Sequence, residues 1–483
     1  MAAQLRRAPW LALSLALHGL IVLVLLLIPR EEPDADSAPQ VRLAPTEQAP
    51  VIDEIPPEPE PEPDIPPVVF DDVPIEEPIS DVIEKSDIVS DVENVADAES
   101  AFDWTGPNPA IGIGGDAGGK YAGRPGGGRR GRRSPTYDTT HAALEWLARH
   151  QDDDGSWDAD EFMKHDVEGT ACDGAGNPAH DVGVTGLALL AFLGDGHTMY
   201  GAGEYADNVH AAVKWLTTQQ DPDSGLLGTA SSNEFVYDHA IATLALVEAS
   251  GLSRSRVLRP YAQRALNYLE YHRNPYGVWR YQPRDGDADT SVTGWCVLAY
   301  KAGQDFDFQV NVQALEFAAA FLDQMTDPAT GRTGYSQRGG SSSRLTGDHA
   351  ERFPREQNEC MSAVSLLCRI FMGGIDAKDP LVEKQAQLVL AKPPRWDEEA
   401  GTIDHYAWYY GTYALYQVGQ SPWRQWQKSL HRAVVKTQRN DANFRGSWDP
   451  RGVWGSTGGR VYSTAILCLT LQAYHRYARV LIR

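Results

Sequence analysis

Two acidic residues, Asp287 and Asp289, stand one position apart immediately before a segment rich in small and apolar residues. A close pair of carboxyl groups can supply acid catalysis. An acidic residue at the start of such a segment can instead cap the exposed amides of a helix. The sequence leaves both interpretations of Asp287 and Asp289 open.

Polar residues also open the other segments of this kind, and aromatic residues lie near them in the sequence. Carboxylates beside aromatic rings suit a site for a cationic or polyol ligand, and the same rings would stabilise a carbocation. The alternative is that these residues are helix caps and packing aromatics. The candidate ligand-binding residues are Asp181, Asp238, His239, Trp295, Glu359, Asp404, His405, Trp408, Tyr409, Arg460 and Tyr462.

A helical repeat positions these residues. Its first copy is an amphipathic segment around Trp146, followed by Gln151, Gly155 and Trp157 and then by a second, apolar segment. Six copies of helix, turn and helix give twelve helices, the number that closes a ring without exposed ends. We therefore predict an all-α fold, an (α/α)6 toroid whose less polar second helices form the inner ring. The five further copies contain Trp215, Trp279, Tyr335, Trp396 and Trp448.

The spacing of Gln151, Gly155 and Trp157 is similar to the repeat of squalene and oxidosqualene cyclases. The whole region after residue 137 resembles the terpenoid-cyclase and protein-prenyltransferase toroid, which implies the same ring of paired helices. In such a repeat we expect the glycine to permit a left-handed turn, the tryptophan to pack between neighbouring hairpins and the glutamine to bond a helix end. These three residues are therefore interpreted as structural.

The catalytic patterns of the families that this region resembles are incomplete here. Squalene-hopene cyclases carry an Asp-x-Asp-Asp-Thr-Ala motif, and Ala288 occupies the position of its proton-donating middle Asp. Prenyltransferases hold zinc through Asp-x-Cys and a histidine, but Asn358 stands where the Asp should precede Cys360, with His405 in the next segment. The resemblance thus implies a noncatalytic or divergent ring without a metal or cofactor. The alternatives are a terpenoid-cyclase-like or prenyltransferase-like enzyme that uses Asp287 and Asp289, and a glycan-cleaving (α/α)6 enzyme.

An apolar run from Pro9 to Ile28 is long enough to form a helix that crosses a membrane. Arg6 and Arg7 precede the run and acidic residues follow it, which places the N-terminus in the cytoplasm and the rest of the chain across the membrane. A cleaved signal peptide is the alternative, but the run ends without a small-residue cleavage site. We expect a single-pass protein of the inner membrane with its ring in the periplasm.

Ser14 and His18 interrupt the apolar run and share one face of the predicted helix. An imidazole inside a bilayer is costly and usually faces a protein partner or a proton path. Together with a later Glu-Pro tract, these residues resemble the N-terminus of TonB-type energy transducers, which implies contact with a proton-channel motor through Ser14 and His18. The small C-terminal domain with which that family grips outer-membrane receptors is absent.

The segments between the predicted membrane helix (1–30) and the ring (138–483) have extreme composition. Residues 31–104 contain 23 Asp and Glu against only Arg42 and Lys85, so this proline-rich stretch carries nearly all of the chain's net charge of -23. We predict a disordered, extended linker there and a Gly/Arg-rich hinge at 105–137.

The near-neutral ring offers no basic excess for nucleic acid, and we expect it to bind an envelope lipid, glycan or protein. The five cysteines form no C-x-x-C pair and are interpreted as buried small residues.

Overall fold

The computed structural model describes residues 136–481, except residues 168, 201–202, 374 and 478. The predicted membrane helix with Ser14 and His18, the acidic linker and most of the hinge lie outside these residues. Within the described ranges the chain forms helices and no β-strand, with two isolated bridges at Gln220–Leu227 and Thr326–Thr333. None of the described helices is both long and apolar enough to cross a membrane.

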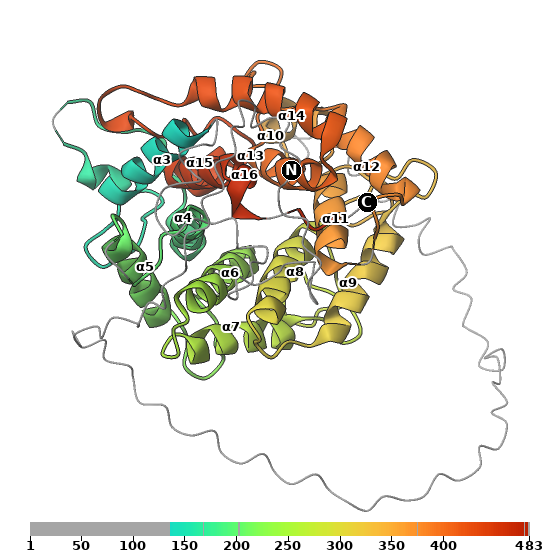
Figure 1. Ribbon diagram of the computed structural model, residues 1–483, viewed down its shortest axis with the longest axis horizontal. Coiled ribbons are helices and arrows are strands. Elements are labelled where there is room, and N and C mark those ends of the chain that lie inside the picture. Colours follow the sequence, from blue (N-terminus) through green and yellow to red (C-terminus); the bar gives the residue numbers. More distant parts are fainter. Residues whose placement is uncertain (1–135, 168, 201–202, 374, 478, 482–483) are drawn as a thin grey trace, which may run out of the picture. The chain divides into compact units, whose positions relative to one another are not determined.

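Outer and inner helices alternate along the chain. The outer helices are α3 (Tyr137–Arg149), α5 (Ala206–Thr218), α7 (Arg259–His272), α9 (Val312–Met325), α12 (Pro380–Leu390) and α14 (Gln420–Ala433). The inner helices are α4 (Asp181–Gly194), α6 (Phe235–Ser253), α8 (Thr290–Asp305), α11 (Cys360–Met372), α13 (His405–Val418) and α15 (Gly455–Leu471). Each inner helix contacts the next, and α15 contacts α4, so the ring closes (Figure 1). The prediction of an (α/α)6 toroid is confirmed.

Hydrophobicity decides which helix of a pair lies inside. Helix α4 is buried at every position from Gly183 to Gly194, whereas α3 buries a stripe that includes Leu144 and Leu147. A helix that is apolar on most sides must be covered on most sides, which only the inner ring provides. Gly186 brings α4 close to α6, because a Cβ atom there would lie 3.0 Å from the Cα of Ala242.

Tryptophans of the repeat close three of the helix pairs in the same way. The indole N–H groups of Trp157, Trp279 and Trp448 each donate a 2.8 Å hydrogen bond to a backbone carbonyl at the end of the preceding outer helix region. Each of these carbonyls also accepts a backbone N–H, so the indole fills the core and adds a second hydrogen bond at a helix end. Gly155 has a φ of +99°, and a Cβ atom there would lie 2.2 Å from the carbonyl oxygen of Ala211. The turn therefore requires glycine, as the sequence predicts.

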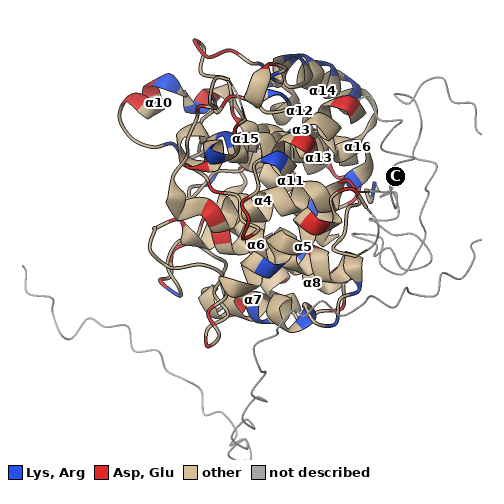
Figure 2. Cartoon of the chain, turned by 90° about the vertical axis from the view of Figure 1, so that its left-hand side faces the viewer, with Lys and Arg blue, Asp and Glu red and all other residues tan. Residues whose placement is uncertain are grey.

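Two short helices lie outside the six pairs. Helix α10 (Asp348–Arg352) belongs to the long connection between α9 and α11, and α16 (Ala473–Arg476) follows α15 and enters the ring (Figure 1). Figure 2 shows α10 protruding from one face of the ring and carrying both acidic and basic residues. The described 3-10 turns are η2 (Phe162–His165), η3 (Pro178–His180), η4 (Arg355–Gln357), η5 (Val435–Thr437) and η6 (Ala442–Phe444).

Candidate ligand site at the mouth of the ring

The end of the ring at which the inner helices begin is called the mouth here. Two of the predicted acidic residues cap helices at this end. One carboxylate oxygen of Asp289 accepts hydrogen bonds from the backbone N–H groups of Ser291 and Val292, both at 2.8 Å. Asp404 accepts a 3.0 Å hydrogen bond from the N–H of Ala407 in the same way. The helix-cap interpretation therefore describes both residues.

The second oxygen of Asp289 faces two tyrosines, Tyr335 and Tyr281. It accepts a 3.1 Å hydrogen bond from the hydroxyl of Tyr335, and that hydroxyl lies 2.6 Å from the hydroxyl of Tyr281. Burial raises the pKa of Asp289 to about 6, although these hydrogen bonds and the nearby charge of Arg280 oppose the rise. Asp289 can therefore hold a proton at mildly acidic pH.

Asp287 does not join Asp289 in a shared cavity. More than half of its side chain is exposed, and it forms an ion pair with Arg280 that lowers the pKa of its carboxyl group. The nearest guanidinium nitrogen of Arg280 lies 3.6 Å from Asp289, so this arginine stands between the two acids. The candidate catalytic pair is thus one buried cap and one exposed ion-pair partner.

Three of the predicted ligand-binding residues are occupied by other parts of the fold. His239 is fully buried, and its ring nitrogens contact the backbone N–H of Leu227 at 3.0 Å and the carbonyl of Ala265 at 3.1 Å. It belongs to the contact between α6 and α7, and not to the mouth. Trp295 and Tyr409 stack on each other inside the ring with ring centroids 5.7 Å apart, where they fill the core.

Other predicted acids are bound by local protein groups, two of them in ion pairs. Asp238 accepts a 3.0 Å hydrogen bond from His180, and Glu359 pairs with Arg332 at 2.5 Å. Asp181 accepts a 2.9 Å bond from the N–H of Ala159. Its pKa is raised to about 7, first by burial and then by the neighbouring carboxylates. These three side chains lie near the beginnings of different inner helices.

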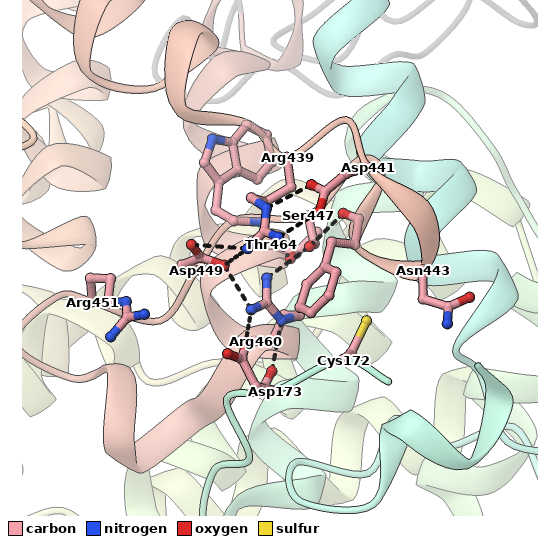
Figure 3. Close-up of polar contacts among 12 residues, drawn as sticks. Cys172, Asp173, Arg439, Asp441, Asn443, Ser447, Asp449, Arg451, Arg460 and Thr464 are labelled. Carbon is pink, nitrogen blue, oxygen red and sulfur yellow. Dashed lines mark hydrogen bonds and ion pairs between the residues drawn. The ribbon is translucent and has the colours of Figure 1, made fainter. Parts of the chain in front are cut away.

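Arg460 joins the last repeat to the first. Its guanidinium is fully buried, lies over the ring of Phe444 at 4.6 Å and bonds the carboxylates of Asp173 and Asp449 (Figure 3). It also donates to the hydroxyl of Ser447 at 3.0 Å. These contacts occupy Arg460 in closing the ring, so it offers little to a ligand.

His405 lies in an aromatic surrounding near the mouth. The ring centroids of Trp396 and Trp408 each lie 5.5 Å from the ring centroid of His405, and that of Tyr462 lies 6.5 Å away. Burial lowers the pKa of His405 to about 3, so the imidazole is neutral. Among the described residues neither of its ring nitrogens has a hydrogen-bond partner, and neither has the hydroxyl of Tyr462. Among the predicted residues that the structure describes, His405 and Tyr462 are the ones whose buried polar atoms lack a hydrogen-bond partner.

A pocket of about 460 Å³ opens at the mouth beside α10. Residues from three distant parts of the sequence form it: the loop before α4, α10 itself and the segment that begins α15. His349 donates from Nε2 to the carbonyl of Val453 at 2.8 Å, while its buried Nδ1 has no partner among the described residues. We call this cavity the mouth pocket, and its side-chain lining includes Asp173, Asp348, His349, Arg352, Phe353, Arg451 and Ser456.

Sequence reasoning did not identify Asp348, His349, Arg352 or Arg451. They lie in connections outside the helical repeat, and only the charge-rich run around Asp348 signals them. A second pocket, of about 530 Å³, lies outside the ring between α7, α8 and the start of α9. There Glu270 accepts hydrogen bonds from Tyr300 at 2.8 Å and Asn311 at 2.9 Å, so its polar groups already satisfy one another.

Comparison with known proteins finds similar solved structures. No family model and no curated protein matches this sequence. Similar solved structures include the type II terpene cyclase MstE from Scytonema, at 15% identity over 70% of this chain and 96% of that one, with a TM-score of 0.43. The alpha-1,6-mannanase from Salegentibacter has 10% identity over 70% and 98% of the two chains and a TM-score of 0.48. A sugar epimerase from a ruminal bacterium has 13% identity over 69% and 96%, with a TM-score of 0.47. At these identities the likeness concerns the fold alone.

Proposed function

We propose that this chain is a membrane-anchored ring that binds an envelope glycan in the mouth pocket without transforming it. The observation that carries the proposal is the composition of the pocket, in which Asp348, His349 and Arg352 surround a cavity beside Phe353. Polar groups of both charges next to an aromatic ring can bond the hydroxyl and amide groups of a sugar while the ring covers its apolar face. An envelope lipid or protein is the other possible occupant.

The state of the two candidate catalytic acids favours binding over catalysis. Asp289 uses one oxygen as a helix cap and the other as an acceptor for Tyr335. Asp287 is exposed and paired with Arg280. An acid catalyst must reach the reacting atom of its substrate within hydrogen-bond distance, and both carboxyl groups are already engaged by protein groups.

One observation supports an alternative function. The pKa of Asp289, raised to about 6 by burial, gives this carboxyl group a proton that an acid catalyst could use. A terpenoid-cyclase-like reaction would protonate a substrate double bond from Asp289 and stabilise the resulting cation on rings such as Tyr335 and Tyr281. This function requires a substrate to displace Tyr335 from the carboxyl group.

The predicted membrane helix gives the ring its place in the cell. We propose that residues 1–30 anchor the chain in the inner membrane and that the acidic linker holds the ring in the periplasm. The apolar run, the preceding arginines and the length of the linker support this arrangement. Contact between Ser14 and His18 and a proton-channel motor belongs to the same proposal, because a buried imidazole needs a partner.

Binding of soluble muropeptides to the full-length chain in detergent tests the pocket. The Arg352→Ala variant should weaken binding at least tenfold, because it removes a charged group of the pocket, and a tenfold loss corresponds to about 1.4 kcal/mol. Arg424→Ala, an exposed arginine on the outer helix α14, is the matched control and should bind normally. Equal affinity in both variants, or no binding by the unmodified chain, would reject a glycan site in the mouth pocket.

A further inference from the structure

Three side chains with metal-binding atoms meet where the first repeat turns between its helices. His150 directly follows α3, Asp166 follows the turn η2, and Cys172 lies in the loop that leads to α4. The ligand atoms of all three lie within 4.8 Å of one another. His150 is 1% exposed and Cys172 5%, and the side chain of Asp166 is 6% exposed. None of the three residues lines the mouth pocket, although Cys172 directly precedes Asp173 of its lining.

The hydrogen bonds of His150 define which of its nitrogens can bind a metal. Nδ1 lies 2.8 Å from the carbonyl oxygen of Trp146, which can only accept, so Nδ1 carries the proton. Nε2 then directs its lone pair at the carboxylate of Asp166, 3.1 Å away. Two acceptors at this distance need a proton or a cation between them. A backbone carbonyl that holds the far nitrogen of a histidine is also the usual support of a metal ligand.

The third group favours a cation over a proton. A proton shared by His150 and Asp166 requires no sulfur, yet Cys172 lies against the same carboxylate, and its backbone N–H bonds the second oxygen at 2.5 Å. Nitrogen, oxygen and sulfur together form the donor set that zinc favours among divalent metals. Two zinc ligands with bonds of about 2.0–2.1 Å stand roughly 3.3 Å apart in a tetrahedral site, close to the distance between His150 and Asp166. We propose that His150, Asp166 and Cys172 bind one zinc ion.

The charges of the site balance. Binding releases the proton of the Cys172 thiol to solvent, and the thiolate and the Asp166 carboxylate then neutralise the two positive charges of zinc. A neutral site suits a buried position, because an unpaired charge there would be costly. Three protein ligands leave a fourth position for water or another small ligand.

The surroundings of the cluster indicate what the metal would do. The loop between Asp166 and Cys172 packs on the last repeat, where the side chain of Asn443 donates to the carbonyls of Val167 at 3.2 Å and Thr170 at 3.0 Å. Immediately after Cys172, the carbonyl of Asp173 accepts a 2.8 Å bond from Arg460 (Figure 3). Zinc would fix this loop at both of its ends and so stabilise the seam at which the first and last repeats close the ring.

Elemental analysis of the full-length chain, purified without chelators, incubated with zinc and desalted, tests the site. We expect one zinc per chain in the unmodified protein and in Cys296→Ala, which removes a buried cysteine of α8, and at least a tenfold lower content in Cys172→Ala. Cobalt in place of zinc should give a thiolate charge-transfer absorption in the unmodified chain, which decides the question even if Cys172→Ala does not fold. Zinc content well below one per chain, equal content in Cys172→Ala and Cys296→Ala, or a cobalt spectrum without the thiolate band would each show that His150 and Asp166 form only an ion pair.

Discussion

The guanidinium of Arg476 lies 3.0 Å from the carboxylate of Glu248 inside the ring, and neither side chain is exposed. Arg476 comes from α16 and also donates to the carbonyl of Leu190 in α4 at 2.7 Å, while Tyr477 donates to Glu248 at 2.8 Å. The C-terminal segment thus fills the ring at the end opposite the beginnings of the inner helices. A ring filled in this way has its accessible pocket at the mouth.

Removal of one partner of this buried pair should strongly destabilise the ring. Glu248→Ala leaves Arg476 as a buried charge without its carboxylate, and losses of this kind cost about 3 to 5 kcal/mol. The free energy of unfolding in urea measures the effect. Glu316→Ala, on the exposed side of α9, is the control and should change stability by less than about 0.5 kcal/mol. A loss in Glu248→Ala no larger than in the control would show that the segment does not support the ring.

Trp157 tests the structural interpretation of the repeat. Its side chain is fully buried and bonds the end of α3, so Trp157→Ala should lower the free energy of unfolding by about 3 to 5 kcal/mol without a specific loss of ligand binding. Trp215→Ala, at a partly exposed tryptophan, should cost clearly less. A Trp157→Ala protein of normal stability that fails only in binding would mean that this residue serves the ligand and not the packing.

The raised pKa of Asp289 predicts a pH dependence of stability. The carboxyl group titrates near 3.9 in the unfolded chain and at about 6 in the folded ring, so the folded state binds more protons between these values. Its contribution to stability is therefore complete below about pH 4 and is lost as the pH rises through 6. Asp289→Asn cannot ionise, so its stability relative to the unmodified chain should rise by roughly 2 to 3 kcal/mol between pH 4 and pH 7. Urea unfolding across this range measures the difference, and parallel pH profiles would contradict the assignment.

The proposed membrane helix allows a prediction in cells. If Ser14 and His18 face a proton-channel motor, crosslinkers at these positions should capture an integral membrane protein, while Leu13 and Ala16 should face lipid. His18→Ala should abolish function but leave insertion intact, since in this proposal Arg6 and Arg7 set the topology. Unchanged function in His18→Ala cells would reduce this helix to a plain anchor.

The fold could be predicted from the sequence because it repeats. The copies share a helix, turn and helix plan, although the later copies are looser, and the second helices carry the apolar residues that require the inner ring, so period and count were sufficient. The filling of the ring was not predictable in this way. Glu248 and Arg476 are far apart in sequence, and their pairing depends on how a short segment after the last repeat folds back.

The site was predicted only in part, for geometric reasons. Asp238 and His239 are neighbours in sequence, but adjacent residues of a helix point about 100° apart, so His239 faces α7 while Asp238 bonds His180. The mouth pocket and the His150 cluster lie mostly in connections between the repeat helices, whose side chains follow no repeat. Sequence spacing alone could not place Asp348 and Arg451 in the lining of one pocket or bring Cys172 close to His150.

The most direct test of binding without chemistry is mass spectrometry of the ligand after incubation with the full-length chain. Squalene, prenyl diphosphates and muropeptides are each incubated with the unmodified protein and with Asp289→Asn, and the bound and free fractions are analysed. We predict that muropeptides are recovered intact from the bound fraction of both proteins, and that none of the probes is converted to a new product. A product formed by the unmodified chain and absent with Asp289→Asn would contradict the account and identify Asp289 as a catalytic acid.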